Sequence, residues 1–201
     1  MAVVLALLLF ALGAVGGASL VTMRMGPQWR IVGHIDLRSR AIKSRLPENL
    51  DIIIVGDSIV EFAPFFRVCG RDTFNSGVAG ARISDLSGIM AFVEAIHPKT
   101  VVFSAGINDV LRPSGDEWIE TLRDWKNRLS NAGVELWIMD LPPLPEKGDK
   151  NVYEFINSAL MSTSGRNVIK FPASADTVDG LHLTRLGYKS WIESIAQAIC
   201  R

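Results

Sequence analysis

Five short strand-like segments constrain the fold of this chain more than any other feature. They lie at residues 52–55, 73–75, 101–104, 134–139 and 168–171, and most of them are continuous apolar runs without polar alternation. Strands of this kind are expected in a parallel sheet that is covered on both faces. The sequence therefore predicts a buried parallel sheet with five strands.

Segments with helical periodicity alternate with these strands. Apolar side chains recur every three or four positions within residues 83–93, 118–129, 152–160 and 186–199, so each segment presents one apolar face. Strands alternating with helices of this length are typical of an α/β protein. We therefore expect a three-layer α/β/α sandwich of the flavodoxin-like class, formed by residues 51–201 as one domain.

The N-terminal segment has a different composition. Residues 2–23 contain no charged side chain, and about 20 apolar residues suffice to span a bilayer as a helix. We expect an uncleaved transmembrane anchor in residues 1–25; a cleaved signal peptide is the alternative, because Gly16, Gly17 and Ala18 could form a processing site. The chain is then membrane-associated, or exported to the cell envelope if the segment is cleaved. Residues 26–50 form a connecting segment, predicted to be helical from about residue 29 to 45.

Charge and cysteine content exclude several classes of protein. Lys and Arg number 21, as do Asp and Glu, so the basic excess typical of a nucleic-acid-binding protein is missing. Cys69 and Cys200 are far apart in sequence and lack the spacing of a zinc site. We interpret them as two buried or free thiols; a disulfide in an oxidising compartment stays an alternative.

Four polar blocks follow the predicted strands or precede the last helix. In such a sheet, ligands bind beyond the carboxyl ends of the strands, so we expect the blocks to gather at one edge. The blocks are Gly56-Asp57-Ser58-Ile59, Asn75-Ser76-Gly77-Val78-Ala79-Gly80, Gly106-Ile107-Asn108-Asp109 and Asp179-Gly180-Leu181-His182.

In this order, the four blocks resemble those of the SGNH (GDSL-type) hydrolases. The resemblance covers residues 52–199 and implies a serine nucleophile at Ser58, with Asp179 and His182 completing the catalytic machinery. A serine hydroxyl needs a base to take its proton, and a histidine oriented by a carboxylate supplies that base. The alternative role for Ser58 is an ordinary helix N-cap. Neither His34 nor His97 is placed for catalysis, and His97 is assigned to structure.

The resemblance also implies three donors to the oxyanion that forms during ester cleavage. They are the backbone N–H of Ser58, the backbone N–H of Gly80 and the side-chain amide of Asn108. Gly77 is the other glycine considered for this role, and it is interpreted as a turn residue. Asp57 and Asp109 are expected to accept backbone hydrogen bonds that hold their loops.

One departure from the family pattern concerns the residues after the nucleophile. Many members carry a glycine there, whereas residues 59–64 contain none, so we expect a crowded entrance beside Ser58.

The function expected from the resemblance is that of a serine esterase acting through an acyl-serine intermediate, with no metal and no cofactor. Its substrates would be small-acyl esters: an acetylated glycan, a lysophospholipid or a short-chain ester. Three alternatives stay open, namely an acyltransferase on the same fold, a metal-dependent phosphoesterase and a non-catalytic flavodoxin-like binding module. The last is disfavoured because a GxGxxG motif is absent.

Overall fold

The fold was analysed in a computed structural model, which describes residues 27–45, 47, 50–64, 66–113 and 115–200. The predicted anchor or signal peptide, residues 1–25, lies outside the described residues. Within the described ranges, no helix is both long enough and apolar enough to cross a membrane.

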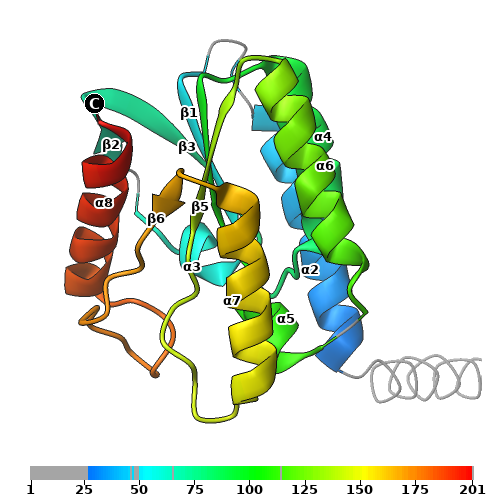
Figure 1. The fold of residues 1–201 in the computed structure, drawn as a ribbon, viewed down its shortest axis with the longest axis vertical. Coiled ribbons are helices and arrows are strands. Elements are labelled where there is room, and N and C mark those ends of the chain that lie inside the picture. The colour runs from blue at the N-terminus through cyan, green and yellow to red at the C-terminus, as the bar shows by residue number, and fades with distance from the viewer. Residues whose placement is uncertain (1–26, 46, 48–49, 65, 114, 201) are drawn as a thin grey trace, which may run out of the picture.

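A six-stranded sheet in the order β2-β3-β1-β4-β5-β6 forms the centre of the molecule (Figure 1). Five strands are parallel and coincide with the five predicted segments: β1 (Ile52–Gly56), β3 (Arg71–Gly77), β4 (Thr100–Ser104), β5 (Glu135–Met139) and β6 (Val168–Ile169). The sheet was predicted to have five strands, and this count was wrong, because the sheet has six. The sixth strand, β2 (Arg67–Val68), runs antiparallel to β3, and its two residues are too short to show a periodicity.

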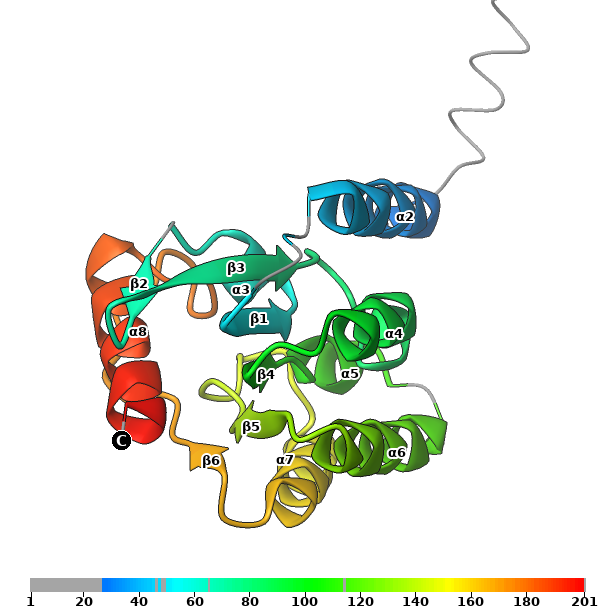
Figure 2. The same ribbon diagram turned by 90° about the horizontal axis from the view of Figure 1, so that it is seen from above.

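Helices cover both faces of the sheet and give the predicted three layers (Figure 2). On one face lie α2 (Pro27–Arg45), α4 (Ser87–Ile96), α5 (Ile107–Leu111), α6 (Glu117–Asn131) and α7 (Lys150–Ser164). The opposite face is covered by α8 (Arg185–Ile199) and the short helix α3 (Ser58–Glu61). A 3-10 turn, η1 (Ser84–Leu86), precedes α4.

Each face of the sheet has its own apolar core. Ile53 and Val55 of β1 belong to the core beneath α4, α6 and α7, whereas Ile52 and Ile54 belong to the core beneath α8. Successive side chains of a strand point to opposite faces, so a strand buried on both sides must be apolar at every position. This is why β1 shows no polar alternation.

The helix α2 confirms the predicted helix of the connecting segment, and it packs onto the domain. Its Ile42 is 2% exposed and joins the core shared with α4. Its Lys43 ammonium lies 5.3 Å from the ring centroid of Phe92 on α4. Residues 27–45 therefore contribute to the folded body as well as connecting it to the preceding segment.

The two cysteines form a disulfide, so the interpretation as two buried or free thiols was wrong and the alternative holds. Cys69 and Cys200 are joined with an Sγ–Sγ distance of 2.06 Å and a Cα–Cα distance of 5.3 Å. Cys69 lies in the turn between β2 and β3, and Cys200 follows α8 directly. The pairing depends on how α8 packs against the edge of the sheet, which a sequence separation of 131 residues conceals.

Candidate active site

Ser58, His182 and Asp179 meet at the carboxyl end of the sheet. Ser58 follows β1 as the first residue of α3, while Asp179 and His182 lie in the loop before α8. Ser58 Oγ lies 2.9 Å from Nε2 of His182, and Nδ1 of His182 lies 2.7 Å from Oδ2 of Asp179. With Nδ1–H donating to the carboxylate, Nε2 is left to accept the hydroxyl proton of Ser58.

The loop that carries Asp179 and His182 is organised by the Asp179 carboxylate. Its Oδ1 accepts the backbone N–H groups of Leu181 at 3.1 Å and His182 at 2.7 Å, while Oδ2 accepts from the imidazole. The hydrogen bond from the His182 side chain, followed by that from its backbone, lowers the pKa of Asp179 from 3.8 to about 2. Asp179 is therefore ionised at neutral pH and can stabilise a positive charge on the imidazole.

Two glycines let the helix of Ser58 lie close to the sheet. A Cβ on Gly56 would come within 2.1 Å of the Ser104 carbonyl oxygen, and a Cβ on Gly77 within 2.1 Å of the Glu61 nitrogen. Both positions exclude any larger residue because the nearest obstacle at each is a backbone atom. From the other side, the Tyr188 hydroxyl of α8 donates to the Ile59 carbonyl at 2.8 Å.

Asp57 and Asp109 hold loops, as predicted. Oδ1 of Asp57 accepts the Ile59 N–H at 3.0 Å and caps α3, and Oδ2 of Asp109 accepts the Ile83 N–H at 3.1 Å. Burial raises the pKa of Asp57 to about 7 and that of Asp109 to about 6. Neither carboxylate is hydrogen-bonded to Ser58 or His182.

The loop of residues 77–81, here called the 77–81 loop, contains a type II turn. The Ala81 N–H donates to the Val78 carbonyl at 3.0 Å, Gly80 has a φ of +76°, and Ala79 is not among the described residues with positive φ. A glycine at the third position is what this turn requires. The turn thereby fixes the direction of the central peptide, which carries the Gly80 N–H.

The hydrogen bonds of Gly77 and Gly80 distinguish the two glycines. The Gly77 N–H donates to Oδ1 of Asn75 at 2.9 Å. In contrast, the N–H groups of Gly80 and Ser58 make no hydrogen bond with any of the described residues. Both groups are thus available to a ligand, which fits the two backbone roles expected for them.

The side chain of Asn108 is fixed next to the same loop. Its amide nitrogen donates to the Ala81 carbonyl at 3.0 Å, which uses one of its two N–H groups and leaves the other for a ligand. Arg112, which follows α5, donates to the Gly80 carbonyl. Hydrogen bonds therefore join the block after β4 to the block after β3, as expected if both lie at one edge of the sheet.

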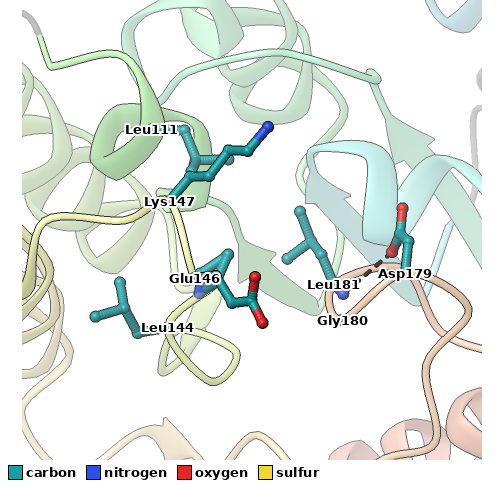
Figure 3. Close-up of a pocket in the computed structure, with 8 residues that line it drawn as sticks. Leu111, Leu144, Glu146, Lys147, Asp179, Gly180 and Leu181 are labelled. Carbon is teal, nitrogen blue, oxygen red and sulfur yellow. Dashed lines mark hydrogen bonds between the residues drawn. The ribbon is translucent and has the colours of Figure 1, made fainter.

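A cleft of about 680 Å³ opens beside the Asp179 loop (Figure 3). Figure 3 shows Leu144 and Leu181 on opposite sides of this cleft, with Leu111 from α5 above them. The full lining consists of Leu111, Leu144, Pro145, Glu146, Lys147, Asp179, Gly180 and Leu181. Sequence reasoning missed the contribution of residues 144–147; the signal was their position just after β5, at the carboxyl end of the sheet.

Phe62 borders the site where the family pattern often has a small residue. Its side chain is 56% exposed, and its ring centroid lies 5.6 Å from that of His182. The structure therefore places an aromatic ring beside the imidazole, and the crowding expected at the entrance stays a prediction.

Neither of the remaining histidines is hydrogen-bonded to Ser58. Nε2 of His34 is 3.0 Å from Glu61, and His97 is exposed at the end of α4. Across the residues that the structure describes, no three His, Cys, Asp or Glu side chains are grouped so that they could hold a metal ion.

Comparison with known proteins gives matches among solved structures. No family model and no curated protein matches the chain. A candidate platelet activating factor from Streptococcus pneumonia superposes with a TM-score of 0.71 at 17% identity, covering 88% of this chain and 97% of the other. A candidate acylhydrolase from Bacteroides fragilis gives 0.67 at 20% identity, with 81% and 94% covered.

A third solved structure carries the name of a protein family. A member of the lipolytic protein G-D-S-L family from Veillonella parvula superposes with a TM-score of 0.61 at 16% identity, covering 76% of this chain and 99% of the other. The chain has the SGNH hydrolase fold. At such low identities, these superpositions support the fold only. The argument for a catalytic activity rests on Ser58, His182 and Asp179, which meet at the sheet edge where this fold binds ligands.

Proposed function

We propose that this chain is a serine esterase that hydrolyses carboxylic esters of small acyl groups through an acyl intermediate on Ser58. The observation that carries the proposal is the continuous hydrogen-bonded series from Ser58 through His182 to Asp179. A nucleophile within hydrogen-bond reach of a base, which is itself oriented by a carboxylate, is the arrangement that activates a serine hydroxyl.

In the proposed reaction, Ser58 Oγ attacks the ester carbonyl carbon while His182 Nε2 takes the hydroxyl proton. The carbonyl oxygen becomes an oxyanion, which is stabilised by the N–H groups of Ser58 and Gly80 and by the Asn108 amide. As the tetrahedral intermediate collapses, the imidazolium gives its proton to the departing alcohol. Water, deprotonated by His182, then attacks the acyl carbon. The intermediate that forms releases the carboxylic acid as its bond to Ser58 Oγ breaks, and the imidazolium returns its proton to Oγ.

The surroundings of the site support a small ester substrate. The cleft beside Asp179 combines the apolar side chains of Leu111, Leu144 and Leu181 with the charged Glu146 and Lys147 at its rim. Such a mixed lining suits a ligand with both apolar and polar groups. Phe62 directly follows the nucleophile's helix, and its ring next to His182 supports a limited space for a long acyl chain. Acetylated glycans, lysophospholipids and short-chain esters all fit this description.

A chain-length series of nitrophenyl esters tests the proposal. The full-length chain should hydrolyse acetyl and butyryl esters faster than dodecanoyl esters, and a fluorophosphonate should label Ser58. Adding an acceptor alcohol and analysing the products separates hydrolysis from transfer, which is the outcome expected of an acyltransferase. Activity that survives Ser58→Ala but disappears on chelation would instead identify a metal-dependent phosphoesterase or another metal mechanism.

We also propose that residues 2–23 hold the enzyme at a membrane, with the folded body on an oxidising side. The length and apolarity of that segment support the membrane attachment, and the Cys69–Cys200 disulfide supports an oxidising compartment. Membrane fractionation combined with thiol trapping tests both points. A soluble product that begins near Ser19 would show that the segment is a cleaved signal, and free thiols in cells would contradict the assigned side.

A further inference from the structure

The carboxylate of Glu61 connects three parts of the molecule that the proposed mechanism treats separately. Glu61 is the last residue of α3, three positions after Ser58, and its side chain is 15% exposed. Its Oε2 accepts the backbone N–H of Ala79 in the 77–81 loop. From α2, Nε2 of His34 lies 3.0 Å from the same oxygen, and Nε of Arg38 lies 3.6 Å from Oε1.

Other hydrogen bonds hold the rest of the 77–81 loop. The Val78 N–H donates to the Gly56 carbonyl at 2.9 Å, and Arg112 binds the Gly80 carbonyl. Glu61 is the partner of the Ala79 N–H, which comes immediately before the peptide that presents the Gly80 N–H. The orientation of that donor therefore depends on a side chain belonging to the nucleophile's own helix.

A carboxylate this close to the proposed oxyanion has an electrostatic cost. Its negative charge opposes the charge that develops on the carbonyl oxygen, and the effect is larger where water is partly excluded. Arg38 offsets it, because a guanidinium is charged at all relevant pH values. Arg38 also donates to the Gly77 carbonyl at 3.0 Å, so α2 contacts the loop directly as well as through Glu61.

We propose that Glu61 is a positioning residue that aims the Gly80 N–H at the oxyanion, that Arg38 and His34 of α2 hold its carboxylate, and that Arg38 offsets its charge. This inference rests on the proposed esterase function. In this proposal α2, the helix that follows the apolar N-terminal segment, supports the catalytic site through Glu61. The substrate does not touch Glu61, whose effect passes through the loop.

Steady-state kinetics on the full-length chain tests the positioning role. Glu61→Ala should lower kcat by roughly 10- to 100-fold with KM changed by less than about twofold, because a misaligned oxyanion donor weakens binding of the transition state more than that of the substrate. Glu61→Gln keeps an oxygen that can accept the Ala79 N–H and should recover most of the loss. The matched control is Glu94→Ala on α4, a carboxylate 21% exposed that lies 3.3 Å from Arg128. It should leave kcat unchanged.

A double-mutant cycle separates the charge from the hydrogen bond. Arg38→Gln should lower kcat several-fold, since it leaves the Glu61 charge without its guanidinium partner. When Glu61→Gln is already present there is no charge to offset, so Arg38→Gln should then cost much less. Additive effects of the two substitutions would overturn the compensation role.

Amide hydrogen exchange provides a readout that does not depend on activity. Exchange in residues 77–81 should accelerate in Glu61→Ala, and should stay at the wild-type rate in Glu61→Gln and Glu94→Ala. If the wild-type chain cleaves no ester, the proposed function fails while the exchange data still decide whether Glu61 holds the loop. The inference is overturned if Glu61→Ala keeps wild-type kcat or wild-type exchange. Should Glu61→Ala not fold, Glu61→Asp takes its place, because its shorter side chain draws the carboxylate away from the Ala79 N–H; it should show the same loss of kcat and the same faster exchange.

Discussion

The hydroxyl oxygen of Ser58 lies 2.9 Å from Nε2 of His182, although 124 positions separate the two residues in the chain. No local structure brings them together. Ser58 begins the short helix α3, which follows the central strand β1. His182 lies just before α8, and α8 covers the same face of the sheet as α3. The contact is therefore a product of the sheet order and of the packing of α8.

The first prediction concerns this contact. Ser58→Ala removes the nucleophile and His182→Ala removes its base, and because the two act as a unit, each should abolish covalent turnover to a similar extent. The double variant should be no less active than either single one. Ester hydrolysis and fluorophosphonate labelling measure the effect, with His97→Ala as the histidine control. A fully active Ser58→Ala variant would contradict the nucleophile assignment.

The second prediction concerns the side-chain donor. Asn108→Ala should reduce kcat by roughly 100- to 1,000-fold, about 3 to 4 kcal/mol, because one oxyanion donor is lost while the nucleophile and base stay in place. Labelling at Ser58 should continue, only more slowly. Since Asn108 also donates to the Ala81 carbonyl, the melting temperature must be measured alongside. Unchanged kcat in a folded Asn108→Ala variant would exclude the amide from the oxyanion site.

Much of the architecture was predictable because both faces of the sheet are buried. Burial on two sides requires apolar residues throughout a strand, and the resulting runs marked the five parallel strands. The polar blocks marked the carboxyl ends of those strands, which is why Ser58, His182 and Asp179 could be expected at one edge. Asp57 and Asp109 were likewise expected to bind backbone groups, and they do.

The features that the sequence did not indicate are either very short elements or contacts between residues far apart in the chain. The strand β2 has two residues and the helices α3 and α5 have four and five, too few to show a period. The disulfide, the contribution of Leu144 to the cleft and the contact of Arg38 with Glu61 all depend on how distant elements pack. No local pattern encodes such contacts.

The third prediction concerns the disulfide. In the chain-entropy model, a cross-link between residues 131 positions apart limits the unfolded state enough to stabilise the native state by about 5 kcal/mol at most. The Cys69→Ser/Cys200→Ser double variant should therefore unfold at a lower urea concentration than the oxidised wild type. Reduction of the wild type should produce the same shift. Identical unfolding curves for all three would show that the cysteines do not pair.

The fourth prediction concerns the pH dependence of stability. Burial raises the pKa of Asp57 from 3.8 to about 7, so between these values the native state holds a proton that the unfolded chain has lost. The free energy of unfolding therefore falls as pH rises through this range. Asp57→Asn cannot ionise and still offers an oxygen to the Ile59 N–H. Its melting temperature should exceed that of the wild type at about pH 8 and approach it at about pH 4.

The control for this experiment is Asp124→Asn, because the Asp124 side chain is 62% exposed and has no comparable burial. Its melting temperature should follow that of the wild type at every pH. A difference between Asp57→Asn and the wild type that is constant with pH would show that the buried carboxyl does not titrate in this range.

The last prediction concerns the direction of one peptide group. Gly80 has a φ of +76° at the third position of its turn, a conformation that costs an alanine roughly 1 kcal/mol or more. A type I turn avoids this cost by rotating the central peptide through about half a turn, which points the N–H of residue 80 the opposite way. Gly80→Ala should therefore remove one oxyanion donor without removing any atom of the site, and kcat should fall by roughly 100-fold or more.

Gly133→Ala is the matched control for this substitution. Gly133 has a φ of +72° in the turn between α6 and β5, and a Cβ there would meet no atom within 4 Å. Each variant should lose some stability, since each substitution disfavours a native backbone conformation with positive φ. Only Gly80→Ala should lose activity, because only that turn faces the proposed oxyanion. Equal kcat in the two variants would show that the Gly80 N–H does not bind the oxyanion.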